Sequence, residues 1–298
     1  MQRRQFIASG SLATLALTTT VGKAIEPFQR DKPGKLRLSL AAYSLRKYLQ
    51  PKAAGERKMD LFEFVDFCHQ QGLAGAELTS YYFPEEVTHD YLLKLKRHCH
   101  LRGVTISGGA IRNDFCKNDP VAIAADLAHT STWVDHYAVL GAPAIRIFAG
   151  AEIKGEELKM TLARCAKVCE AACLQAAQKG ILLALENHGG VTARADGLLE
   201  VVRQVNSTAF GVNFDSGNFR VDDPYAELEK IAPYAVNAQI KVEMHAEGKS
   251  QQTDLPRVIN ILKDAGYSGW VALEYEAAEE PLEAIPRWLE KLKPLVDG

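Results

Sequence analysis

Four polar side chains lie at or near the ends of four short apolar runs in the C-terminal half of the chain. Three are the carboxylates of Glu186, Asp215 and Glu274, and the fourth is the amide of Gln239. Carboxylates that converge on one place repel each other unless a cation joins them, and oxygen donors suit hard divalent ions. These residue types therefore predict a divalent-metal site, with Mn²⁺ as the expected ion and Mg²⁺ or Co²⁺ as alternatives.

The apolar runs that carry these residues have the character of buried parallel strands. They are rich in Val, Ile, Leu and Phe and lie between helical stretches. Parallel barrels open their active sites at the C-terminal ends of their strands. Each interval between the four polar residues can hold one helix and one strand, so we expect the four groups on adjacent strands, the fifth to the eighth.

Strand and helix signals alternate from residue 36 to the end of the chain, without a composition break. Apolar runs predict strands at 36–43, 74–78, 104–107, 144–148, 181–186, 210–215, 236–242 and 270–274. Alternation of this kind gives a parallel sheet, and eight strand–helix units favour a closed (β/α)₈ TIM barrel over an open doubly wound sheet. No Gly-x-Gly-x-x-Gly or Walker pattern supports a nucleotide-binding fold.

The first residues resemble an export signal rather than part of the fold. Arg3 and Arg4 precede a weakly apolar stretch that ends at a small-residue cleavage site. A retained membrane anchor is the alternative, but several serines and threonines make the stretch a poor membrane span. The predicted divisions are a twin-arginine-type signal at 1–24, a linker at 25–35 and a barrel at 36–298. We therefore expect a periplasmic protein without stable membrane insertion after cleavage.

The charge of the chain argues against nucleic acid as a partner. The formal net charge of the chain is −2. Removal of the predicted signal makes this charge more negative, because all charged residues of the signal are basic. A mildly acidic protein without a basic stretch is not expected to bind nucleic acid. A small molecule is the expected partner, and self-association into a homo-oligomer stays open.

The six cysteines do not have the placement of a disulfide framework. Cys165, Cys169 and Cys173 recur every four residues in an Ala-rich helical stretch, where they form one apolar stripe. Side chains on successive turns of one helix do not easily reach disulfide geometry. We expect these thiols to pack in the core and not to take part in the site.

Four segments at the predicted strand ends carry a family resemblance. They read Leu-Glu-Asn-His-Gly-Gly at 185–190, Asn-Phe-Asp-Ser-Gly-Asn at 213–218, Gln-Ile-Lys-Val at 239–242 and Leu-Glu-Tyr-Glu at 273–276. Weaker similarities occur at 42–45, 75–78 and 140–146. Together these segments resemble the xylose-isomerase-like barrel superfamily, in the branch of sugar phosphate isomerases and epimerases. The similarity covers nearly all of residues 36–295.

The resemblance implies a ligand set and a pair of catalytic groups. In relatives the metal is held by Glu, Asp, His and Glu, so Glu186, Asp215 and Glu274 map directly. Gln239 stands where many members have His, and Asn218 stands where epimerases often carry a substrate-contacting His. In resembling epimerases the first and last glutamates of the set also move the proton, which here means Glu186 and Glu274.

The expected chemistry is proton transfer through an enediolate. A divalent ion on a carbonyl and its neighbouring hydroxyl acidifies the intervening C–H bond, and carboxylates on opposite faces exchange the proton. The candidate substrate-binding residues are His188, Asn218, Lys241, Arg146, Glu77 and Tyr43. Lys241 could instead neutralise the acids, and Glu77 and Tyr43 could be structural.

The leading functional hypothesis is a metal-dependent isomerase or epimerase of sugars or keto-sugars. The alternative is a β-eliminating lyase or dehydratase, which forms the same enolate on 3-keto-sugars or glycosides and then expels a substituent. Phosphodiester hydrolysis would need further histidine ligands and a basic groove, and neither is evident in the sequence. A non-catalytic sugar-binding barrel would not need the two glutamates.

Overall fold

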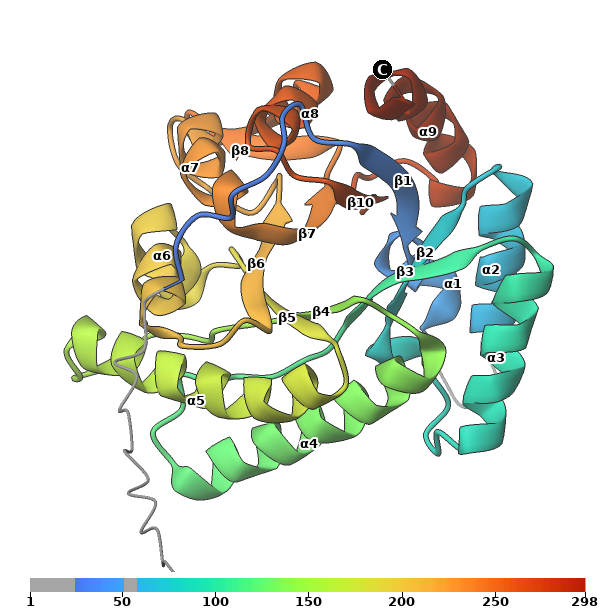
Figure 1. Cartoon of the computed structure of the whole chain (residues 1–298). Coiled ribbons are helices and arrows are strands. Elements are labelled where there is room, and N and C mark those ends of the chain that lie inside the picture. Colours follow the sequence, from blue (N-terminus) through green and yellow to red (C-terminus); the bar gives the residue numbers. More distant parts are fainter. Residues whose placement is uncertain (1–24, 51–57, 298) are drawn as a thin grey trace, which may run out of the picture.

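The computed structural model describes residues 25–50 and 58–297 and has eight parallel strands that close into a barrel surrounded by helices (Figure 1). Around the barrel the strand order is β1, β10, β7, β6, β5, β4, β3, β2. The barrel strands are β1 (Leu36–Ala41), β2 (Gly75–Thr79), β3 (Thr105–Ala110), β4 (Ala144–Ile147), β5 (Leu182–Glu186), β6 (Phe210–Asp215), β7 (Ala235–Ile240) and β10 (Gly269–Leu273). The predicted TIM barrel is confirmed, and the predicted export signal lies outside the described residues.

The helices pack around the outside of the barrel (Figure 1). Their bounds are α1 (Arg46–Leu49), α2 (Leu61–Gln70), α3 (His89–Leu101), α4 (Pro120–Leu140), α5 (Leu158–Gln178), α6 (Ala195–Gln204), α7 (Pro224–Ile231), α8 (Leu255–Asp264) and α9 (Pro281–Asp297). Within the two described ranges, no helix has the length and apolarity that a membrane span requires. The cysteines are free and buried, as expected of core thiols.

Local sequence signals explain where several helices begin. The side chains of Asp119, Asp223 and Asp254 each accept a hydrogen bond from the first turn of the following helix, and each of these helices has Pro in its first turn. Aspartate at the N-cap and proline just after it both favour helix initiation. These caps mark where α4, α7 and α8 begin.

One pair of strands was not predicted. An antiparallel hairpin of β8 (Glu243–Ala246) and β9 (Lys249–Gln252) follows β7. Its turn places Glu247 and Gly248 at φ values of 51° and 76°, the left-handed conformation of tight hairpin turns. All residues of β9 are exposed and polar, so the segment has no apolar pattern from which a strand could be predicted.

The inside of the barrel contains a buried layer of polar side chains beneath its C-terminal mouth. Glu77 accepts hydrogen bonds from Asn237 Nδ2 at 2.8 Å and Gln239 Nε2 at 2.6 Å. Asn213 donates to Gln239 Oε1 at 2.6 Å and accepts from Asn237 Nδ2 at 2.8 Å. A Cβ at Gly108 would lie 3.2 Å from Glu77 Oε2, so the glycine makes room for the carboxylate. These bonds fix the orientation of every amide in the layer.

Replacement of Glu77 by leucine should destabilise the barrel by about 2–6 kcal/mol. The substitution removes the acceptor of two buried amides, and each unsatisfied buried group costs about 1–3 kcal/mol. Urea unfolding followed by circular dichroism measures the loss, with Glu85→Leu on the exposed surface as the matched control. Equal stability of the two variants would show that the polar layer does not hold the barrel together.

Candidate active site

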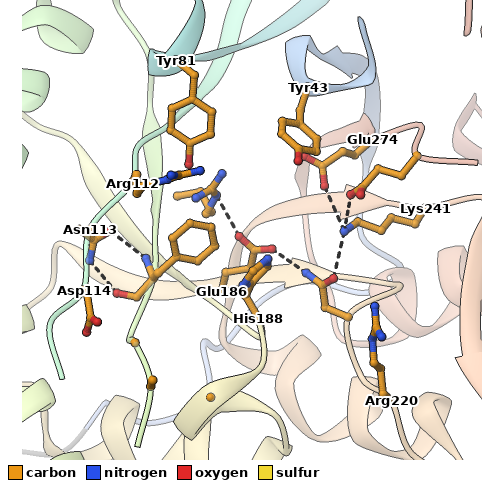
Figure 2. Close-up of a pocket in the computed structure, with 17 residues that line it drawn as sticks. Tyr43, Tyr81, Arg112, Asn113, Asp114, Glu186, His188, Arg220, Lys241 and Glu274 are labelled. Carbon is orange, nitrogen blue, oxygen red and sulfur yellow. Dashed lines mark hydrogen bonds and ion pairs between the residues drawn. The ribbon is translucent and has the colours of Figure 1, made fainter. Parts of the chain in front are cut away.

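A cavity of about 550 Å³ opens at the C-terminal mouth of the barrel (Figure 2). Every barrel strand supplies part of its lining, through residues at or just beyond the strand end. In order from β1 to β10 these include Tyr43, Tyr81, Arg112, Phe148, His188, Asn218, Lys241 and Glu274. Glu186 and Arg146 also line the cavity, from the strands β5 and β4. The position is the one at which TIM barrels carry their active sites.

Glu186 is the last residue of β5, and its carboxylate is held on both sides. Its Oε2 forms an ion pair with Arg146 Nε at 2.9 Å, and its Oε1 accepts a hydrogen bond from Asn218 Nδ2 at 2.7 Å. The Arg146 guanidinium also donates to the carbonyl of Ile111 at 2.8 Å and stacks on the Phe148 ring. Burial raises the pKa of Glu186, and the charge of Arg146 opposes this shift.

Lys241 lies one residue beyond β7 and reaches three carboxylates with its ammonium group. Nζ lies 3.3 Å from Asp215 Oδ2, 3.4 Å from Glu274 Oε2 and 2.7 Å from Glu276 Oε1. It also donates a hydrogen bond to Asn218 Oδ1 at 3.0 Å. Burial raises the pKa of Glu274, whereas the charge of Lys241 lowers it, so Lys241 favours the ionised carboxylate.

Asp215 and Gln239 lie behind the wall of the cavity and do not line it. Asp215 ends β6, is fully buried, and accepts a hydrogen bond on Oδ1 from the Gly217 amide at 2.8 Å. Burial raises its pKa to about 7, and the charge of Lys241 opposes the shift. Gln239 Nε2 points toward carboxylates, with Glu77 Oε1 at 2.6 Å and Glu274 Oε1 at 3.5 Å.

The four residues predicted as metal ligands do not form a ligand cage that fits a divalent ion. Asp215 and Glu274 face an ammonium group, Glu186 faces a guanidinium, and Gln239 presents its N–H donors to the acids. Within residues 25–50 and 58–297, no three His, Cys, Asp or Glu residues are grouped so that they could hold a metal ion. The arrangement therefore does not support the Mn²⁺ site predicted from the sequence.

Of the predicted substrate-binding residues, Glu77 alone lies away from the cavity. Glu77 belongs to the polar layer beneath the cavity, where burial raises its pKa to about 7.

His188 lines the cavity with its ring 4.5 Å from that of Phe148. Burial, with the charges of Arg146 and Lys241, lowers the pKa of His188 to about 4, so the imidazole is neutral at neutral pH. Tyr43 completes the wall beside Glu274 (Figure 2).

Several residues of the cavity were not predicted from the sequence. They are Glu276, Tyr81, Arg112, Asn113, Asp114, Phe148 and Arg220. Glu276 had a local signal, because it follows Glu274 at a spacing of two residues, and side chains at that spacing point the same way in an extended chain. Arg112 had none, because the strand before it was predicted to end at Ser107 although β3 continues to Ala110.

Comparison with known proteins agrees with this architecture. Residues 62–292 match the family described as xylose isomerase-like TIM barrel. The chain belongs to this family. No curated protein has a significantly similar sequence.

Solved structures with the same fold have little sequence in common with this member of the family. A D-psicose 3-epimerase with D-tagatose from Clostridium cellulolyticum H10 has a TM-score of 0.72 and 14% identity, with 88% of this chain and 100% of that chain covered. The IOLI protein with a bound zinc atom has a TM-score of 0.71 and 17% identity, with 87% and 98% covered. A xylose isomerase domain protein from Planctomyces limnophilus has a TM-score of 0.65 and 18% identity, with 89% and 98% covered. At these identities the likeness concerns the fold.

Proposed function

We propose that this barrel is an isomerase or epimerase of sugars or keto-sugars and acts through an enediolate. The observation that carries the proposal is the pair of carboxylates in the cavity, Glu186 at the end of β5 and Glu274 directly after β10, with two strands between them. Two carboxylates that reach a substrate from different strands can remove a proton from one face of a carbon and return it to the other. The sugar epimerases among the solved neighbours support the same class of substrate.

The cations of the cavity suit the charge that develops during such a reaction. Removal of a proton next to a carbonyl leaves negative charge on the carbonyl oxygen, and fixed positive groups stabilise it. Lys241 and Arg146 lie beside the two glutamates, and the neutral imidazole of His188 can donate a hydrogen bond to a substrate oxygen. No step of this proposal passes through a bound metal, because the donor set does not fit one.

The second candidate is a β-eliminating lyase or dehydratase on 3-keto-sugars or glycosides. The volume of the cavity favours it, because about 550 Å³ is within the range of sites for drug-sized ligands and leaves room for a substituent on a sugar ring. Both candidates share the first proton transfer and differ in the fate of the enediolate, which an epimerase reprotonates on carbon and a lyase converts to an unsaturated product by loss of a β-substituent. The same residues therefore serve either reaction.

Incubation with ketoses and 3-keto-glycosides in D₂O, followed by NMR, should identify the reaction. An epimerase incorporates solvent deuterium at the inverted carbon and otherwise conserves the mass of the product. A lyase releases water or an aglycone and leaves an unsaturated keto-sugar that absorbs in the near ultraviolet. The panel is run with EDTA and with added Mn²⁺, so that the result does not depend on a metal. A broad panel without exchange or elimination under either condition would contradict both candidates.

A further inference from the structure

The ammonium group of Lys241 lies among carboxylates that the sequence assigns to a metal. Its Nζ is within 3.4 Å of Asp215 Oδ2 and Glu274 Oε2, and closer still to Glu276 Oε1. Asp215 ends β6 and the two glutamates follow β10, so the lysine joins elements on both sides of β7. Two of the three carboxylates are those expected to bind a divalent ion.

The backbone around Lys241 is built to hold this side chain in place. Its backbone N–H donates to Ser216 Oγ at 2.8 Å, which ties the end of β7 to the end of β6. A Cβ at Gly217 would lie 2.7 Å from Lys241 Cδ, so the glycine allows the lysine to pass close to the chain. The side chain is 12% exposed. Lys241 is therefore a largely enclosed part of the site, unlike a surface lysine that happens to reach an acid.

Gln239 is oriented as a hydrogen-bond donor toward the acids. Asn213 Nδ2 donates to its Oε1, and its own Nε2 donates to Glu77. A reversed amide would place Oε1 against the Glu77 carboxylate and Nε2 against the Asn213 amide, which loses both bonds. The polar layer therefore turns the ligating oxygen of Gln239 away from the place where a fourth metal ligand is needed.

Glu186, the remaining expected ligand, already has a cation of its own. Arg146 Nε pairs with Oε2 at 2.9 Å, and Asn218 Nδ2 donates to Oε1 at 2.7 Å. Oε1 is thus hydrogen-bonded, whereas Oε2 has the Arg146 guanidinium as its ion-pair partner and accepts no hydrogen bond from the described residues. Each of the three expected carboxylate ligands has a side-chain cation as its partner, which is the role that a divalent ion would otherwise have.

We propose that Lys241 takes the place of the divalent ion in this barrel and that the protein binds and converts its substrate without a metal. In this site the ammonium balances the carboxylates of Asp215 and Glu274 and donates a hydrogen bond to the substrate oxygen on which negative charge develops. Arg146 balances Glu186 in the same way. The inference concerns the same site as the proposed function and rests on it for the role of the substrate oxygen.

Metal binding by the purified protein tests this inference independently of activity. The protein is produced with added Mn²⁺ and dialysed, and its metal content is measured by elemental analysis. Mn²⁺ titration is followed by the EPR signal of the free ion. We expect far less than one ion per chain and no saturable tight site. One tightly bound ion per chain that is lost in Asp215→Asn would overturn the inference.

Removal of the ammonium should create the metal site that it replaces. Lys241→Met leaves Asp215, Glu274 and Glu276 without their cation, so its affinity for Mn²⁺ should rise at least about tenfold over the wild type. Lys179→Met is the matched control, because Lys179 pairs with Asp135 on the surface at 3.0 Å and its loss should not change Mn²⁺ binding. Unchanged Mn²⁺ binding in a folded Lys241→Met variant would contradict the proposal.

These measurements separate the inference from the proposed function. A metal-free wild-type protein that converts a keto-sugar in the presence of EDTA agrees with both. A metal-free protein without activity on the whole panel contradicts the proposed function, while the metal measurements still support Lys241 as the cation of the site. Activity that EDTA abolishes and Mn²⁺ restores contradicts the inference and leaves the sugar isomerase proposal intact.

Discussion

Glu186→Gln and Glu274→Gln should each lower turnover of a true substrate by about 10²–10⁴-fold, the usual contribution of one general acid or base. Glutamine keeps the shape of the side chain and a hydrogen-bonding oxygen but cannot carry the proton. Both glutamates line the cavity, so each can reach a bound substrate. The rate of the chemical step, measured in single turnovers, reports the loss directly. Glu283→Gln, on the exposed surface of α9, is the control and should keep the wild-type rate.

The two variants should also differ in hydrogen exchange. If the carboxylates serve opposite faces of one carbon, a variant with one base left can still remove the proton from one epimer. It should therefore exchange deuterium into that epimer in D₂O without inverting it, and the other variant should do so with the other epimer. Full exchange into both epimers by both variants would show that a different group moves the proton.

The sequence was sufficient to predict the architecture and the position of the acids. Most barrel strands are apolar runs between helical segments, and both patterns are local properties of the chain. Glu186 and Asp215 end their strands, and Glu274 comes directly after β10. Because parallel strands in a barrel end at one mouth, a residue at a strand end has a predictable place even though its contacts are unknown.

The contacts of Gln239 and Lys241 could not be predicted in this way. Gln239 donates to Glu77, which lies 162 residues earlier in the chain, and this bond decides which atom of the amide faces the acids. Lys241 was expected on the strand, whereas β7 ends at Ile240. Its contacts depend on how the ends of β6 and β10 are spaced around it. These contacts between distant strands form only when the barrel has closed.

The end of β3 was missed for a different physical reason. Gly108 and Gly109 resemble a turn, but both belong to the strand. A Cβ at Gly109 would lie 2.4 Å from the Tyr137 ring, and Gly108 leaves room for Glu77. Glycine inside a strand often marks such a close approach. The misplaced strand end hid Arg112 and its neighbours in the wall of the cavity.

Arg146→Met should lower the free energy of unfolding by about 3–5 kcal/mol, as expected when one partner of a buried ion pair is removed. Arg146 and Glu186 are 4% and 2% exposed, so removal of the guanidinium leaves a largely desolvated carboxylate without its ion-pair partner. The same substitution removes the hydrogen bond to the carbonyl of Ile111. Urea unfolding measures the loss. Lys94→Met is the control for an exposed pair with Asp90 and should cost under about 1 kcal/mol.

A double-mutant cycle with Glu186→Gln separates the ion pair from the other contacts of Arg146. If the loss in Arg146→Met comes from an unpaired Glu186 carboxylate, the double variant should recover much of it, because the glutamine side chain carries no charge to bury. If the loss comes from packing on Phe148 and the bond to Ile111, the two substitutions should add. Additivity would mean that Glu186 is not held as an anion by Arg146, and the charge balance inferred for the site would then fail at this residue.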